Sequence, residues 1–174
     1  EGVWSRFKPE KGKDKRGVTG VTMERIIKIG KNITKIPQNF NAHSTIKRIF
    51  ENKKNMFKSG KNFDWTTAEQ LAFATLLDEG TPVRLSGQDS GRGTFSQRHS
   101  VLRDQENNNY YTPLNNISNK QKRFEVIDSL LSEFAVLGFE HGYALSEPTT
   151  LVLWEAQFGD FANGAQVVID QFIA

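Results

Sequence analysis

The stretch LLSEFAVLGFEHGYALSEPTTLVLWEAQFGDFANGAQVVIDQF, from Leu130 to Phe172, decides the fold. Ser132 can cap a helix over residues 133–145, and residues 149–154 (TTLVLW) form a continuous apolar run, typical of a strand buried on both faces of a parallel sheet. The apolar face of a final helix comprises Phe161, Ala165, Val168, Ile169 and Phe172. This stretch therefore predicts a helix, a strand and a second helix.

The same alternation extends upstream. Residues 124–127 (FEVI) predict a strand, and Thr66 with Glu69 has the spacing of a capping box that begins another helix. Gly80 can take the left-handed conformation that ends this helix, and a short strand follows at residues 83–85. Helix, glycine and strand is the unit of a parallel α/β sheet, so we predict an α/β domain with a parallel sheet flanked by helices.

Charge divides the chain of 174 residues into two parts. Residues 1–61 contain 16 Lys/Arg against 5 Asp/Glu, whereas residues 62–174 contain 7 against 15. Residues 1–20 are rich in Lys and Gly and indicate a linker or arm, and two short peripheral helices are predicted at residues 22–33, with Thr22 as N-cap, and 44–57. We therefore predict a basic N-terminal arm, residues 1–61, and an α/β domain, residues 62–174.

The basic part has two interpretations. It could meet phosphate or an acidic partner, as in a nucleic-acid-binding module, or it could be a solvated surface that complements the acidic half of the chain. Nucleic-acid-binding surfaces often present aromatic side chains to bases, but the aromatic residues of the 44–57 helix fall on its apolar face. We therefore favour the second interpretation.

Composition limits the classes of protein. The chain has no cysteine, which excludes disulfides and thiolate metal sites. No run of about 18 apolar residues and no signal-peptide pattern is found, so we expect a soluble protein without a membrane partner. The sequence starts at Glu1 without Met and stops at Ala174 within a helical pattern, and we expect it to be a piece of a longer protein.

A polar segment at residues 86–123 separates the first strand from the second. Loops of this length in compact domains are usually functional or disordered. Arg98 and His99 within it suit an anionic ligand, or they are tied into local hydrogen bonds. The segment contains no complete phosphate-binding glycine motif.

Two acids follow predicted strands. Glu133 comes shortly after residues 124–127 and Glu155 directly after residues 149–154, and ligands of parallel sheets bind beyond the carboxyl ends of the strands. Glu133 would lie in the first turn of a helix, whose dipole favours a carboxylate, so it is either a ligand-binding group or a solvated acid. We expect the side chain of Glu155 to bind and anchor backbone groups. The three histidines lack metal-ligand spacing, and no metal site is predicted in this chain.

Four blocks in order carry a family resemblance. They are RLSGQDSGRGTFSQRHSVLRDQ (84–105), YTPLNN (111–116), SLLSEFAVLGFEHGYALSEP (129–148) and LWEAQFGDFANGAQVVIDQFI (153–173). Together they resemble the thiamine-diphosphate-dependent first component of 2-oxoglutarate dehydrogenase complexes, and their sequence looks more like the bacterial than the mitochondrial form. The region resembled is the first part of a pyrimidine-binding domain of transketolase type.

The resemblance implies roles for individual residues. Glu133 matches the family glutamate that hydrogen-bonds the aminopyrimidine ring and relays a proton. Phe161 matches the aromatic residue that stacks on that ring, Gln157 a nearby polar contact, and Leu131 a packing residue beneath it. No family residue is matched to Arg98 or His99, which remain candidates for contact with the substrate.

The resemblance also implies the reaction and its partners. We expect decarboxylation of 2-oxoglutarate with transfer of the succinyl group to a lipoyl group on a partner acyltransferase, in the tricarboxylic acid cycle. The related 2-oxoadipate enzyme shares several of the blocks and is the alternative. Diphosphate and magnesium would be bound by a domain outside this segment, the complete protein would be a homodimer, and this segment alone would be inactive. The expected compartment is the bacterial cytoplasm, or the mitochondrial matrix in a eukaryote.

Overall fold

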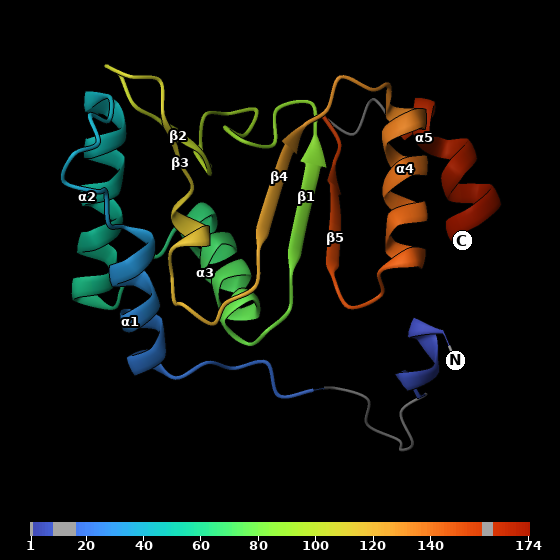
Figure 1. The fold of residues 1–174 in the computed structure, drawn as a ribbon, viewed down its shortest axis with the longest axis horizontal. Helices are drawn as coiled ribbons and strands as arrows, with labels where there is room; N and C mark the ends of the chain where they lie inside the picture. Colours follow the sequence, from blue (N-terminus) through green and yellow to red (C-terminus); the bar gives the residue numbers. More distant parts are fainter. Residues whose placement is uncertain (1, 9–16, 158–161) are drawn as a thin grey trace.

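The computed structural model describes residues 2–8, 17–157 and 162–174, without the side chains of residues 162 and 163. Helices lie on both sides of a small sheet (Figure 1). In chain order the elements are η1 Val3–Arg6, α1 Met23–Ile33, α2 Ser44–Ser59, α3 Trp65–Asp78, β1 Val83–Gly87, β2 Leu102–Arg103, β3 Tyr110–Tyr111, η2 Pro113–Asn115, β4 Phe124–Asp128, α4 Glu133–Ser146, β5 Leu151–Glu155, α5 Ala162–Val168 and the π-helical turn η3 Ile169–Ile173.

The main sheet has three parallel strands in the order β4-β1-β5, which confirms the predicted fold class. β1 is central, and its last residue, Gly87, pairs with Asp128 at the end of β4 and with Glu155 at the end of β5. The carboxyl ends of all three strands therefore meet at one edge. β2 and β3 form a separate antiparallel pair within the long polar segment, so that segment is partly structured.

Side chains of β1 alternate between the two faces of the sheet. Val83 and Leu85 belong to the main hydrophobic core, which α3 also lines with Phe73 and Leu77. Every residue of β1 is buried, whereas every residue of β5 is half-buried. The prediction that this strand is buried on both faces is confirmed only in part: Leu151 and Leu153 pack against the main core and Trp154 against a cluster on the other face, but β5 stays half-buried because it lies at the edge of this sheet.

Arg84 holds α4 on the opposite face of the sheet. Its Nε lies 2.7 Å from Glu140 Oε2 on α4, and its Nη1 lies 2.5 Å from Glu125 Oε2 on β4. The guanidinium also stacks on the ring of Tyr143, 4.6 Å from the ring centroid. Hydrogen bonds to two carboxylates, chiefly that of Glu140, raise the Arg84 pKa, so its charge is permanent.

Several predicted helix boundaries are confirmed and one is wrong. Thr22 caps α1 by accepting a hydrogen bond from Arg25 N, and Gly80 follows α3 with a φ of +95°. α3, however, begins at Trp65, because Asp64 accepts from Thr67 N at 2.7 Å and takes the capping role expected for Thr66.

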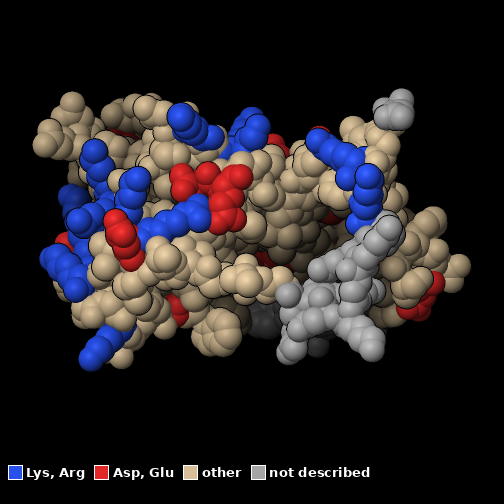
Figure 2. Space-filling view, turned by 90° about the horizontal axis from the view of Figure 1, so that it is seen from below, with Lys and Arg blue, Asp and Glu red and all other residues tan. Residues whose placement is uncertain are grey.

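Helices α1 and α2 are less peripheral than expected. Ile29 and Ile33 of α1 and Phe57 of α2 are buried in the same core as the sheet. Gly30 allows the two helices to meet, because a Cβ built on it would lie 2.2 Å from Phe57 Cδ1. Lys and Arg side chains gather on the outer surface of this pair of helices, at the left of Figure 2.

We expect Gly30→Ala to destabilise the protein by about 1–3 kcal/mol, because the added methyl group overlaps the buried Phe57 ring. Thermal unfolding of the complete protein measures the change. Lys31→Ala, at the next position on α1 but with an exposed side chain, is the control and should change stability by less than about 0.5 kcal/mol. Equal effects of the two substitutions would contradict the packing interpretation.

Candidate functional site at the carboxyl edge of the sheet

Glu133 begins α4 just beyond the carboxyl end of β4. The loop between them is fixed by Ser129, whose N–H donates to Gly87 O at the end of β1 at 2.6 Å. The Oε1 atom of Glu133 accepts a hydrogen bond of 2.8 Å from Gln88 Nε2. Oε2 accepts no hydrogen bond from the residues that the structure describes, so it is available to a ligand.

Gly164 lies near Glu133 in space and Leu131 lies near it in sequence. The backbone of α5 approaches it at Gly164, where an added Cβ would lie 3.7 Å from Glu133 Oε2. Leu131, two residues before it, is an apolar side chain that is 48% exposed. The site thus offers a carboxylate oxygen and an apolar side chain next to a helix that contains a glycine.

Gln157 lies two residues after the end of β5. Its Nε2 donates to Thr94 Oγ1 at 3.1 Å, which links the segment after β5 to the loop after β1. Phe161 lies outside the residues that the structure describes, so its predicted role stays a prediction.

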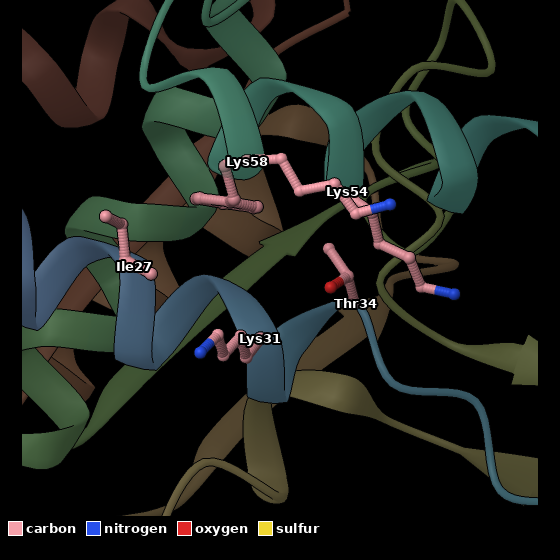
Figure 3. A pocket seen from close by; sticks show the side chains of 6 residues that line it. Ile27, Lys31, Thr34, Lys54 and Lys58 are labelled. Atoms are coloured by element: carbon pink, nitrogen blue, oxygen red, sulfur yellow. The ribbon is translucent and has the colours of Figure 1, made fainter.

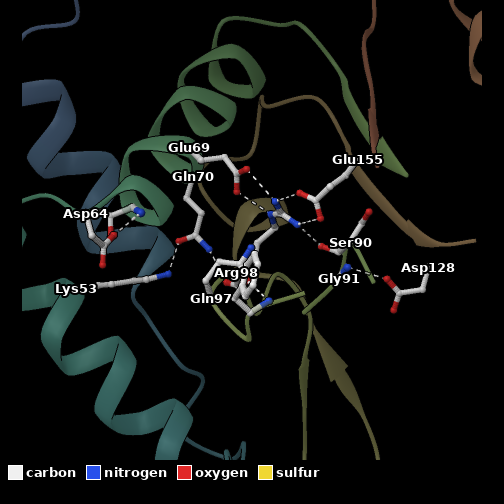
Figure 4. A network of polar contacts seen from close by, with 12 residues as sticks. Lys53, Asp64, Glu69, Gln70, Ser90, Gly91, Gln97, Arg98, Asp128 and Glu155 are labelled. Carbon is white, nitrogen blue, oxygen red and sulfur yellow. Dashed lines mark hydrogen bonds and ion pairs between the residues drawn. The ribbon is translucent and has the colours of Figure 1, made fainter. Parts of the chain in front are cut away.

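Arg98 is at the centre of a polar network that surrounds the loop 88–100 (Figure 4). The residue is 3% exposed. Nε and Nη2 bind the carboxylate of Glu69 on α3 at 2.7 and 3.0 Å, and Nη1 binds Glu155 Oε1 at 2.9 Å, with a further short contact from Nη2 to Glu155 Oε2. Nη1 also donates to Ser90 O at 2.8 Å. All five N–H donors of this guanidinium therefore have partners within the chain.

These contacts support the second interpretation of Arg98, the one based on local hydrogen bonds. Its donors are used by protein groups, as the local hydrogen-bond alternative expects, and this placement favours a structural role over direct contact with a substrate. Glu155 accepts from a side chain instead of the backbone groups that we expected it to anchor.

His99 follows with a φ of +47°, and its N–H donates to Arg92 O at 3.0 Å. Partial burial lowers the pKa of His99, and the positive charges of Lys53 and Arg92 lower it further, so the neutral imidazole is favoured. Its contact with a substrate stays a prediction.

A second layer joins the loop to the basic helices. Lys53 on α2 is buried and donates from Nζ to Gln70 Oε1 at 2.7 Å, and Gln70 Nε2 donates to Arg98 O at 2.9 Å. Burial lowers the pKa of Lys53 to about 8, against the opposing attraction of Asp64 and Glu69. Helix α2 is therefore linked to the loop through hydrogen bonds.

Sequence reasoning missed several members of this edge. Gln88, the first residue of the loop, binds Glu133, and Asp128 Oδ1 at the end of β4 accepts from Gly91 N at 2.7 Å. Glu69 was assigned to a helix cap instead of to Arg98. The only signal in the sequence was the position of Gln88 directly after a strand, where ligands of parallel sheets bind.

An apolar cavity lies elsewhere, between α1 and α2 (Figure 3). It has a volume of about 250 Å³ and is lined by Ile27, Lys31, Thr34, Lys54, Phe57 and Lys58. None of these residues contacts Glu133, Gln157 or Arg98 through a side chain hydrogen bond in the described structure.

Among the described residues there is no cluster of three or more His, Cys, Asp or Glu that could hold a metal ion. None of the described helices has both the length and the apolar character that a membrane crossing requires.

The parallel sheet flanked by helices agrees with the class of domain that a family comparison assigns to this chain. Residues 61–174 match the family described as transketolase, pyrimidine binding domain, and the chain belongs to this family. The resemblance seen in the sequence is thereby confirmed.

Within this family, the chain is similar to proteins of one name. The chain is 55% identical to the 2-oxoglutarate dehydrogenase E1 component of Brucella anthropi over an alignment of 176 residues. It is 54% identical to the proteins of the same name from Brucella canis and Brucella ovis. Each alignment covers the whole of this chain and 18% of the relative, so the chain spans less than a fifth of the length of these relatives.

Lys53 predicts a pH dependence of stability. Because its folded-state pKa is about 8 against 10.5 in the unfolded chain, the unfolded state binds more protons between these values, and Lys53 makes stability rise with pH across that window. Relative to Lys53→Met, the wild-type protein should gain up to about 1.4 kcal/mol per pH unit from pH 8 to 10. Thermal unfolding of both proteins at pH 7, 8, 9 and 10 measures this gain.

Lys58→Met, on the exposed side of the same helix, provides the baseline for removing a lysine from α2. A difference between wild type and Lys53→Met that stays constant across these pH values would show that the buried amine does not titrate in this range.

Proposed function

We propose that this chain supplies the pyrimidine-binding part of a thiamine-diphosphate-dependent 2-oxoglutarate dehydrogenase, the succinyl-transferring enzyme of the tricarboxylic acid cycle. The observation that carries the proposal is the position of the Glu133 carboxylate. Its carboxylate stands at the start of α4 beside the carboxyl ends of the strands, with Oε1 held by Gln88 and Oε2 available. The names of the relatives, 2-oxoglutarate dehydrogenase E1 component, support the choice of reaction.

The site residues fit the aminopyrimidine half of this cofactor. A carboxylate oxygen without a donor among the described residues suits a ring nitrogen, and the exposed Leu131 suits the apolar face of a ring. We assign ring stacking to Phe161 and a polar contact near the ring to Gln157, whose amide is already oriented by Thr94. An aromatic pair of this kind contributes about 0.5–1.5 kcal/mol beyond area burial.

In the proposed mechanism Glu133 exchanges a proton with the ring nitrogen that it binds. Gln88 holds Oε1 of the Glu133 carboxylate, which leaves Oε2 to bind the ring nitrogen and exchange the proton. Thiamine diphosphate, when bound, would supply the nucleophilic carbon and the electron sink that decarboxylation of a 2-keto acid requires. The residues of this chain orient the ring and hold the proton.

The remaining parts of the proposal concern the complete protein. The substrate is 2-oxoglutarate, the succinyl group passes to a lipoyl group on a succinyltransferase partner, and the enzyme acts as a homodimer. Magnesium and the diphosphate are bound by residues outside this chain, and the segment alone is inactive. The compartment is the cytoplasm in a bacterium. Comparing the decarboxylation of 2-oxoglutarate with that of 2-oxoadipate by the complete protein decides between the two related activities.

Glu133→Gln in the complete protein should reduce decarboxylation by at least about 100-fold, because an amide cannot exchange the proton. The rate is measured with 2-oxoglutarate and an artificial electron acceptor, and thermal unfolding checks that the variant is folded. Glu51→Gln, on the surface of α2, is the control and should retain wild-type activity. Full activity of Glu133→Gln would refute the role of Glu133.

Phe161→Ala should weaken the binding of thiamine diphosphate by about 3- to 10-fold, the loss expected when an aromatic contact is removed. Titration of the apo form of the complete protein with the cofactor, in the presence of magnesium, measures the dissociation constant. An unchanged constant would argue against stacking by Phe161.

A further inference from the structure

The guanidinium of Arg98 joins three segments that are distant in sequence. It binds Glu69 in the second turn of α3, Glu155 at the last position of β5, and the carbonyl of Ser90 in its own loop. With a side chain that is 4% exposed and both carboxylates partly buried, the ion pairs are shielded from solvent. Such a group has one geometry that satisfies all its donors, so it fixes the relative positions of the three segments.

The link to Glu155 lies next to the proposed cofactor site. Glu155 precedes Gln157 by two residues, and Gln157 is tied to the same loop through Thr94. Two contacts from the loop 88–100, one ionic and one neutral, therefore set the path of the chain as it leaves β5. The link from Arg98 to Glu69 reaches α3 instead, on the side of the main core.

The same loop also reaches the other side of the site. Gln88 binds Glu133 at the start of α4, and Gly91 N binds Asp128 at the end of β4. The loop thus contacts the chain after both outer strands. A displacement of the loop relative to β5 changes the separation between Glu133 and the segment that contains Gln157.

We propose that the ion pair between Arg98 and Glu155 is a positioning device for thiamine diphosphate: it holds residues 155–157 at the distance from Glu133 that the aminopyrimidine ring requires. Arg98 and Glu155 act through Gln157 and contact neither cofactor nor substrate. Glu69 anchors the guanidinium to α3, and it contributes to the stability of the fold but not to cofactor binding. The inference rests on the proposed function and adds residues to the same site.

Glu155 and Glu69 allow a matched test, because each gives the guanidinium two hydrogen bonds and each can be changed to Gln without a change of volume. In the complete protein, both Glu155→Gln and Glu69→Gln should lower the midpoint of thermal unfolding, since each leaves the buried arginine with one carboxylate partner. Only Glu155→Gln should weaken thiamine diphosphate binding, by about tenfold, as expected for a displaced binding group. Glu69→Gln should change the dissociation constant by less than about twofold.

Thr94→Val tests the neutral contact with little change in shape, and it decides the matter if Glu155→Gln does not fold. It should weaken cofactor binding by about 3-fold, as expected for one lost hydrogen bond, with the midpoint of unfolding unchanged. Equal dissociation constants for Glu155→Gln and Glu69→Gln, or constants of wild-type value for both Glu155→Gln and Thr94→Val, would overturn the positioning role. A wild-type protein that does not bind thiamine diphosphate would overturn the proposed function, and this inference with it.

Discussion

The buried guanidinium of Arg98 is the interaction on which the carboxyl edge of the sheet depends. An arginine that is removed from water needs its charge compensated and its donors satisfied, and here both needs are met by groups from α3, β5 and the loop after β1. The long polar segment that follows β1 is therefore ordered near the site by charge, whereas the helices are ordered by apolar packing. Hydrogen bonds from Lys53 through Gln70 to the carbonyl of Arg98 extend this order to α2.

A second arginine has the matching task on the other face of the sheet. Arg84 projects from β1 toward α4 and is neutralised by Glu140 and Glu125. It fixes the helix whose first residue is Glu133, while Arg98 fixes the strand end and the loop that surround it. The proposed proton relay, Glu133, thus lies between α4, which Arg84 holds, and the end of β5 with its loop, which Arg98 holds. This arrangement suits a residue whose orientation has to be fixed.

Local signals made much of this fold predictable. Apolar runs marked β1, β4 and β5, a capping threonine marked α1, and a glycine marked the end of α3, because each depends on residues a few positions apart. The location of Glu133 followed from the rule for parallel sheets. The position of β5 at the edge could not be predicted, since strand order depends on packing between distant segments. The carboxylate partners of Arg98 lie 29 and 57 residues away, and both Asp64 and Thr66 were possible caps of α3, so neither outcome could be predicted from spacing.

The two outer strands have a practical consequence for anyone who produces this segment separately. Asn115 covers the first residue of β4 by exchanging hydrogen bonds with the backbone of Phe124, but in the described part of the chain no strand pairs with the remaining outer edge of β4 or with that of β5. Unpaired strand edges are templates for association with another copy. Preparations of the isolated segment should therefore be handled at low concentration, and aggregation there would reflect these open edges and not a failure of the core to form.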